Sequence, residues 1–210
     1  MQQRKHLQSF SDIATNFNLN PVTQHPGFHG DINLINLADE LLEKSSKFIE
    51  TGANLGNTLY FVSNNYDLKC FSCEIHSETS KTITGHKNVF FEQKSSPQFI
   101  YDLPLTQDIC TFWLDAHSGK NQTIHLEELQ FIIDNYSQYY IFIDDVNVNL
   151  PGWTHNNYSI SDIVSILGEN DLIYSPNYLE LDNPFHGKTG WVLITNLDFD
   201  TKTHVKLLSK

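Results

Sequence analysis

Short apolar runs alternate with predicted helices through most of the chain. The runs lie at 48–49, 70–73, 88–93, 109–114 and 139–143, with two later ones at 172–174 and 191–195. Helices are predicted near 31–46, 57–62, 77–84, 95–97, 123–135 and 160–167. Strands that are apolar throughout are typical of a parallel sheet with both faces covered. The sequence therefore predicts an α/β fold of the Rossmann-like, doubly wound kind, with a mostly parallel seven-stranded sheet.

Composition indicates one domain and disfavours some partners. The 210 residues, 40% of them hydrophobic, suffice for one sizeable core, so we expect a single domain over 1–210. The formal net charge of −12 offers no basic surface to nucleic acid or to anionic membranes. The first ten residues lack the apolar core of a signal peptide, and we expect a cytoplasmic protein. The sequence leaves open whether the protein forms a homodimer.

The stretch 47–58, KFIETGANLGNT, has the pattern of a ligand-binding turn. A short strand runs into Glu50, two glycines at 52 and 56 bracket a turn, and Asn57 with Thr58 opens the next helix. A turn of this kind lets a ligand approach bare backbone N–H groups at a helix N-terminus. The stretch therefore predicts a cradle for a nucleotide-like ligand.

Glu74 ends the second predicted strand, where an acidic side chain in such units accepts hydrogen bonds from ribose hydroxyls. A turn that served packing alone would need neither this acid nor Glu50. Asn54 stands where the G-x-G-x-x-G pattern has its middle glycine, which disfavours a pyrophosphate and suits a nucleoside ligand without phosphates. Together with Gly52 and Gly56, these acids resemble the first motif and ribose acid of the class I S-adenosylmethionine (SAM)-dependent methyltransferases.

This resemblance implies SAM as the cofactor. We expect the donor to contact the turn, the start of the following helix, and acids or hydroxyls at the ends of later strands. These residues are Glu50, Thr51, Gly52, Ala53, Asn54, Gly56, Asn57, Thr58, Glu74, Ser95 and Asp115.

Acidic residues follow two further strands, at Asp115 and at the pair Asp144-Asp145. The carboxyl ends of parallel strands meet at one edge of the sheet, where ligands bind. Crowded carboxylates repel each other and raise each other's pKa unless a positive charge lies between them. A hard divalent cation would supply that charge, with these three aspartates as ligands and other positions open to water or substrate.

Two alternatives stay open from the residues alone. Asp144 can cap a following turn while Asp145 faces water, although the acid at 115 on the preceding strand favours the cation site. His117 can be a metal ligand, a base or a loop histidine with a structural role.

A closer resemblance rests on the string FWLDAHSG at 112–119, the helix with HLEEL at 125–129 and YIFIDDV at 140–146. Over residues 45–150 the sequence resembles metal-dependent O-methyltransferases related to the macrocin and sugar O-methyltransferases of antibiotic pathways. The resemblance implies Mg²⁺ or Mn²⁺ held by Asp115, Asp144 and Asp145, and it implies Asp115 as general base. We take Asp115 and His117 as the catalytic candidates.

The sequence thus predicts a SAM-dependent, divalent-metal-assisted O-methyltransferase that acts on a small-molecule hydroxyl, such as that of a sugar or another natural-product-type acceptor. One alternative is a SAM-binding protein without catalysis, which the three aspartates disfavour. Another is a nicotinamide-dependent oxidoreductase, which Asn54 and the lack of an evident Tyr-x-x-x-Lys relay disfavour.

Three other segments carry weaker signals. Cys70 and Cys73 match C-x-x-C, but within a strand this spacing points the two sulfurs to opposite faces, so we expect buried, reduced thiols. Residues 1–30 are polar and irregular and predict a surface arm, or a lid formed by 25–30. The segment 150–155, with Trp153, could form one wall of an acceptor pocket or serve packing.

Overall fold

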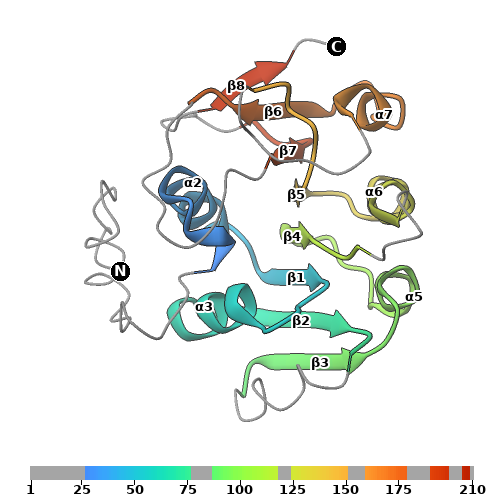
Figure 1. The fold of residues 1–210 in the computed structure, drawn as a ribbon. Helices are drawn as coiled ribbons and strands as arrows, with labels where there is room; N and C mark the ends of the chain where they lie inside the picture. Colours follow the sequence, from blue (N-terminus) through green and yellow to red (C-terminus); the bar gives the residue numbers. More distant parts are fainter. Residues whose placement is uncertain are drawn as a thin grey trace.

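The computed structural model describes residues 27–76, 87–117, 124–150, 159–178, 190–198 and 205–208. Its strands are β1 (Lys47–Thr51), β2 (Lys69–Glu74), β3 (Val89–Gln93), β4 (Cys110–Leu114), β5 (Tyr139–Ile143), β6 (Leu172–Pro176), β7 (Val192–Thr195) and β8 (Val205–Leu208). They form one sheet in the order β3-β2-β1-β4-β5-β7-β6-β8 (Figure 1). Strands β1 to β5 are parallel, and β7, β6 and β8 are antiparallel to their neighbours. The predicted mostly parallel, Rossmann-like sheet is confirmed.

The prediction of seven strands was one too few. Strand β8, with the sequence VKLL, pairs antiparallel with β6 at the edge of the sheet. Its side chains are exposed or half-buried. A short edge strand that is not buried lacks the apolar run by which the central strands are recognised.

The central strands are apolar because helices cover both of their faces. Every residue of β4 (CTFWL) and β5 (YYIFI) is buried. By contrast, no residue of the edge strand β3 is buried. Continuous burial of this kind is what parallel sheets between two helical layers require.

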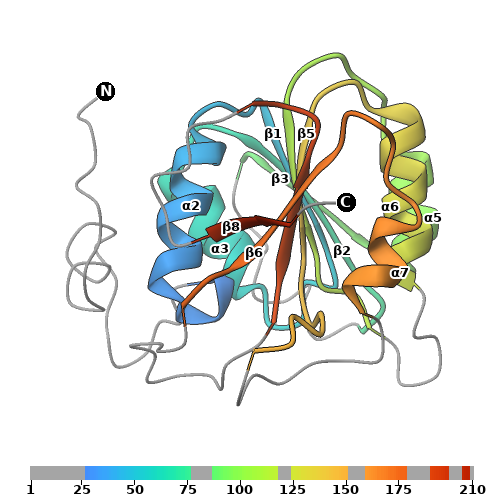
Figure 2. The ribbon, with the colours of Figure 1, turned by 90° about the horizontal axis from the view of Figure 1, so that it is seen from above.

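The helices form two layers. Helices α2 (Ile32–Leu42) and α3 (Asn57–Asn65) cover one face of the sheet, and α5 (Ser96–Asp102), α6 (Ile124–Asn135) and α7 (Ile160–Val164) cover the other (Figure 2). The predicted helices at 31–46 and 160–167 are present but end earlier, and the one predicted at 77–84 lies outside the described residues. Within the described residues, no helix combines the length and apolarity that crossing a bilayer demands.

The segment 27–30 is part of the folded core. Phe28, in the short 3-10 turn η1 (Phe28–Gly30), is fully buried, and its ring meets those of Phe48, Phe61 and Trp113 edge-on, with centroids 6.3, 6.0 and 5.1 Å away. These four residues are therefore not part of a surface arm, and the lid over the ligand site stays a prediction. Residues 1–26 lie outside the described part of the chain, as do 151–155 with Trp153.

All three cysteines are unpaired and buried, which confirms the buried, reduced thiols predicted at Cys70 and Cys73. Burial raises the pKa of the Cys70 thiol to about 12 and that of Cys110 to about 11, and it raises the pKa of Cys73 as well. Thiols protonated at neutral pH are poor nucleophiles and poor metal ligands. The C-x-x-C spacing is therefore a packing feature of β2.

Strand order reverses between β1 and β4, since β2 and β3 follow β1 on one side and β4 and β5 lie on the other. In open α/β sheets, ligands bind outside the carboxyl ends of the strands at such a switch point. The strand-end acids of the sequence lie at this edge.

Candidate active site

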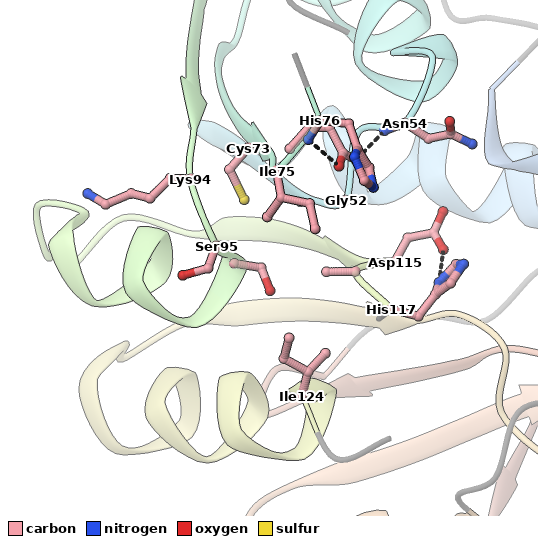
Figure 3. Close-up of a pocket in the computed structure, with 13 residues that line it drawn as sticks. Gly52, Asn54, Cys73, Ile75, His76, Lys94, Ser95, Asp115, His117 and Ile124 are labelled. Carbon is pink, nitrogen blue, oxygen red and sulfur yellow. Dashed lines mark hydrogen bonds and ion pairs between the residues drawn. The ribbon is translucent and has the colours of Figure 1, made fainter. Parts of the chain in front are cut away.

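A cavity of about 440 Å³ opens at the carboxyl ends of β1, β2 and β4 (Figure 3). This volume is within the range of about 300–1,000 Å³ that is usual for small-molecule sites. The cavity is lined by Gly52, Asn54, Cys73, Glu74, Ile75, His76, Lys94, Ser95, Ser96, Asp115, Ala116, His117 and Ile124.

The turn between β1 and α3 forms one wall of this cavity. Gly52 and Gly56 have φ of 75°, and Asn54 has φ of 48°, so the turn passes through left-handed backbone three times. A Cβ at Gly52 would lie 2.6 Å from the carbonyl oxygen of Asp115 and 2.7 Å from the Cα of Ala116. Gly52 therefore lets the loop after β1 lie directly against the loop after β4.

Glu74 presents a fixed carboxylate to the cavity from the end of β2. Its Oε2 accepts a hydrogen bond from the backbone N–H of Asn54 at 3.0 Å, and its Oε1 accepts one from the backbone N–H of His76 at 3.0 Å (Figure 3). A carboxylate oxygen can accept more than one hydrogen bond, so both oxygens can still accept from a ligand. Two oxygens held in this way suit a vicinal diol.

A cluster of acids and histidines adjoins the cavity and shares Asp115 and His117 with its lining. We call it the acid–histidine cluster, and its five side chains are those of Asp115, Asp144, Asp145, His29 and His117. His29 Nε2 lies 2.6 Å from Asp144 Oδ2. His117 Nδ1 lies 3.6 Å from Asp115 Oδ1 and 3.8 Å from Asp145 Oδ2. The acids that follow β4 and β5 therefore lie close together in the structure, as predicted.

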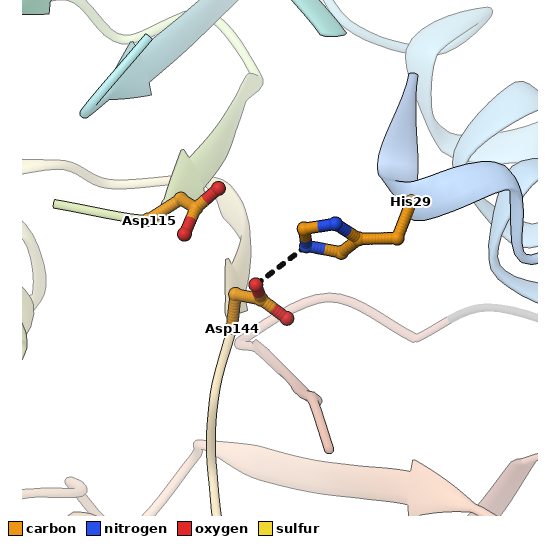
Figure 4. A group of neighbouring side chains, drawn as sticks. All are labelled: His29, Asp115 and Asp144. Carbon is orange, nitrogen blue, oxygen red and sulfur yellow. Dashed lines mark hydrogen bonds and ion pairs between the residues drawn. The ribbon is translucent and has the colours of Figure 1, made fainter. Parts of the chain in front are cut away.

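The cluster contains two overlapping groups of donor atoms. One comprises His29, Asp115 and Asp144 (Figure 4), and the other comprises Asp115, His117 and Asp145. Within each group the donor atoms lie within 4.8 Å of one another. Carboxylate oxygens are the ligands that hard divalent cations prefer, and imidazole nitrogens suit transition ions. The donor set therefore fits a divalent cation, with Asp115 common to both groups.

Burial and crowding shift the pKa values of the cluster. Burial raises the pKa of Asp115 well above its usual range, and the charges of Asp144 and Asp145 raise it further. Burial and the charge of Asp144 likewise raise the pKa of Asp145. Burial lowers the pKa of His29, but the charge of Asp144 and the hydrogen bond to it outweigh burial, and the net shift is upward. Positive charge among these carboxylates would offset their repulsion.

No protein-family model and no curated protein matches the sequence. Among solved structures, the chain is similar to an rRNA methylase from Streptococcus thermophilus, with 16% identity over 78% of this chain and 96% of that one, and a TM-score of 0.51. It is similar to the plantazolicin methyltransferase BamL, solved with a triazolic desmethylPZN analog and S-adenosylhomocysteine (SAH), with 10% identity over 89% and 91% of the chains and a TM-score of 0.55. It is also similar to SMU.1697c from Streptococcus mutans, solved with SAH, with 13% identity over 78% and 97% and a TM-score of 0.55. The chain shares the α/β fold of these structures.

The structure brings only some of the residues predicted to contact the donor into the cavity lining. Gly52, Asn54, Glu74, Ser95 and Asp115 line it, and so does the catalytic candidate His117. Six predicted contacts do not appear in the lining: Glu50, Thr51, Ala53, Gly56, Asn57 and Thr58.

Glu50 and Thr51, at the end of β1, are buried and do not line the cavity. The Glu50 carboxylate accepts a hydrogen bond from the Ser72 hydroxyl at 2.8 Å, and burial raises its pKa to about 7. Thr51 is fully buried, and its hydroxyl donates to Glu128 Oε2 at 3.2 Å. Both side chains are buried and bonded to neighbouring side chains, so these two residues serve the core.

Seven residues that line the cavity were not predicted. Six of them neighbour a predicted residue in the sequence: Cys73, Ile75 and His76 around Glu74, Lys94 and Ser96 around Ser95, and Ala116 after Asp115. Only Ile124, at the start of α6, had no sequence signal, because helix packing brings it to the cavity. The Lys94 ammonium points away from the cavity (Figure 3), where it pairs with Glu92 at 3.3 Å and with Asp102.

Glu128, on α6, is fully buried. Burial raises its pKa from 4.5 to about 8. Between these two values the unfolded state has released the proton while the folded state retains it, so the free energy of unfolding falls as pH rises. The stabilising contribution is complete below about pH 4.5 and is lost as pH approaches about 8.

Glu128→Gln is therefore expected to weaken the pH dependence of stability, because the amide keeps the side-chain shape but does not ionise. The difference in Tm between about pH 5 and about pH 8 should shrink by at least about 2–4 °C, the equivalent of about 1 kcal/mol in a protein of this size. Thermal denaturation at both pH values measures it. Glu127→Gln, at an exposed position of the same helix, is the control. If Glu128→Gln kept the wild-type pH dependence, Glu128 would not be the buried acid inferred here.

Proposed function

We propose that this protein is an enzyme that transfers the methyl group of SAM to a hydroxyl of a small molecule, with a divalent cation held by Asp115, Asp144 and Asp145. One observation carries the proposal: Asp115 lines the cavity and also belongs to both donor groups of the acid–histidine cluster. A donor in the cavity and a cation in the cluster would therefore meet at Asp115. Neighbours of the same fold that were solved with SAH support SAM as the donor.

The cavity walls match the parts of SAM. Glu74 offers two fixed acceptor oxygens for the ribose hydroxyls. Ile75, which is half exposed, and Ile124 offer apolar surface for the adenine ring. The loop with Gly52 lies against the loop that carries Asp115, so a donor in contact with Gly52 would have its sulfonium end near Asp115.

Asp115 and His117 are placed to receive the proton of the acceptor hydroxyl. As the hydroxyl oxygen bonds to the methyl carbon and the carbon–sulfur bond breaks, the O–H proton passes to one of these side chains and SAH leaves. His117 is largely exposed, with a side-chain exposure of 59%, and its Nδ1 lies 3.6 Å from Asp115 Oδ1, so a proton taken up by His117 has direct access to solvent. A divalent cation, when bound, would lower the pKa of the acceptor hydroxyl and compensate the charge of the aspartates.

Charge favours a small acceptor over RNA, although an rRNA methylase is among the neighbours. The net charge of −12 and the acidic cluster beside the cavity would repel a phosphate backbone. A neutral hydroxyl compound, such as a sugar or another natural-product-type acceptor, meets no such repulsion. We therefore propose a small-molecule hydroxyl as the acceptor.

The donor site is tested by replacing Glu74. Glu74→Ala is expected to weaken SAM binding by about 1.5–3 kcal/mol, or roughly 10- to 150-fold in Kd, because hydrogen bonds to a charged group are lost. Isothermal titration calorimetry with SAM measures it. Glu92→Ala, which removes an exposed acid from the paired position on β3 next to Cys73, is the control. Equal affinity of Glu74→Ala and the wild type would remove Glu74 from the donor site.

A further inference from the structure

The backbone around His29 is held in place by contacts with the core of the protein. The backbone N–H of the preceding residue, Phe28, donates to Thr58 Oγ1 at 3.0 Å, which ties the segment to the first turn of α3. A Cβ at Gly27 would lie 3.0 Å from Phe61 Cβ and 3.1 Å from Thr58 Cα, so the segment lies tightly on that helix. The buried Phe28 ring anchors it further.

From this anchor, the His29 imidazole is directed at the carboxyl end of β5 (Figure 4). Its Nε2 lies 2.6 Å from Asp144 Oδ2, and its ring packs on Trp113 with centroids 5.8 Å apart. The Asp144 side chain is only 1% exposed, whereas that of His29 is 23% exposed. An imidazole held in this way cannot turn away from the cluster without losing its packing.

Three separate chain segments thus place donor atoms around one point: His29 before α2, Asp115 after β4 and Asp144 after β5. A set of carboxylate oxygens alone suits Mg²⁺ or Ca²⁺, whereas an added imidazole nitrogen shifts preference toward Mn²⁺ and later transition ions. We propose that His29 supplies a nitrogen ligand to the cation, so that the site binds a transition ion of the Mn²⁺ class in preference to Mg²⁺. This inference rests on the cation of the proposed function.

The test is Mn²⁺ binding to the full chain, with pulsed electron paramagnetic resonance to detect nitrogen bound to Mn²⁺. The wild type should bind Mn²⁺ more tightly than Mg²⁺ in competition and show the nitrogen signal. His29→Asn, which suits the left-handed backbone at φ 54° but has too short a side chain to reach the ion, should lose that signal and bind Mn²⁺ about 10- to 100-fold more weakly. His117→Asn should keep the signal. In the His29 variants, unchanged SAM affinity verifies the fold.

A second variant, His29→Gln, keeps a side chain of similar reach but offers an amide oxygen. Its ratio of Mn²⁺ to Mg²⁺ affinity should fall toward that of an all-oxygen site. If His29→Asn bound Mn²⁺ like the wild type, or if the nitrogen signal disappeared only in His117→Asn, His29 would be no ligand while the proposed function would stand. If the wild type bound SAM but no Mn²⁺, both this inference and the cation of the proposed function would fail.

Discussion

Replacing Asp115 with asparagine is expected to lower kcat by about 10²- to 10⁴-fold, even at saturating metal, because this side chain links the cavity with both donor groups of the cluster. The amide keeps the shape of the carboxylate but cannot take a proton. The affinity for SAM should change little, since Glu74 and the Gly52 turn hold the donor. Transfer of a labelled methyl group from SAM to a hydroxylated acceptor, found by screening sugars and phenols, measures the rate.

Asp134→Asn is the matched control for Asp115→Asn, because Asp134 is exposed on α6 and bonds only to Gln130 among the contacts described. Chelation by EDTA should likewise stop turnover while SAM still binds. Full activity of the wild type in EDTA would contradict the role of the cation. Full activity of Asp115→Asn would exclude Asp115 as the base and leave His117.

Replacing Gly52 with valine is expected to abolish measurable SAM binding. The residue has φ of 75°, which costs about 1–2 kcal/mol for a side chain with a Cβ and more for a β-branched one. Its Cβ would also overlap the Asp115 carbonyl at 2.6 Å, so the two loops that form the cavity would have to separate. Each 1.4 kcal/mol that this separation costs in the bound state lowers affinity by about tenfold.

Calorimetry with SAM measures the effect of Gly52→Val, and Gly52→Ala should give a smaller loss in the same direction. Gly168→Ala is the control, since a Cβ there would meet only Asp171 Oδ2, at 3.3 Å, and the backbone is not left-handed. Wild-type SAM affinity in Gly52→Val would show that the turn after β1 is not part of the donor site.

The parallel half of the fold follows from the sequence because burial on both faces produces continuous apolar runs. Strand β5 occupies the predicted residues 139–143 without change, and β4 differs by one residue at its start. Since acids directly after such strands must lie at the carboxyl edge, the meeting of Asp115 with Asp144 and Asp145 could also be predicted.

The contacts that side chains make beyond the strand ends could not be predicted in the same way. Asp144 and Asp145 are adjacent in the sequence, yet Asp144 contacts His29 while Asp145, at φ 58°, approaches His117. His29 lies 115 residues from Asp144 in the sequence, and only the anchoring of Phe28 in the core brings them together. No local pattern encodes a contact of that range.

The central claim is that SAM and a divalent cation bind side by side at Asp115. A crystal structure of the protein soaked with SAH and Mn²⁺ tests it most directly. The account predicts SAH in the cavity with its ribose on Glu74, and an anomalous Mn²⁺ peak within about 2.0–2.4 Å of oxygens from Asp115 and at least one of Asp144 and Asp145. SAH bound elsewhere, or SAH in the cavity with no Mn²⁺ at these aspartates under saturating conditions, would contradict it.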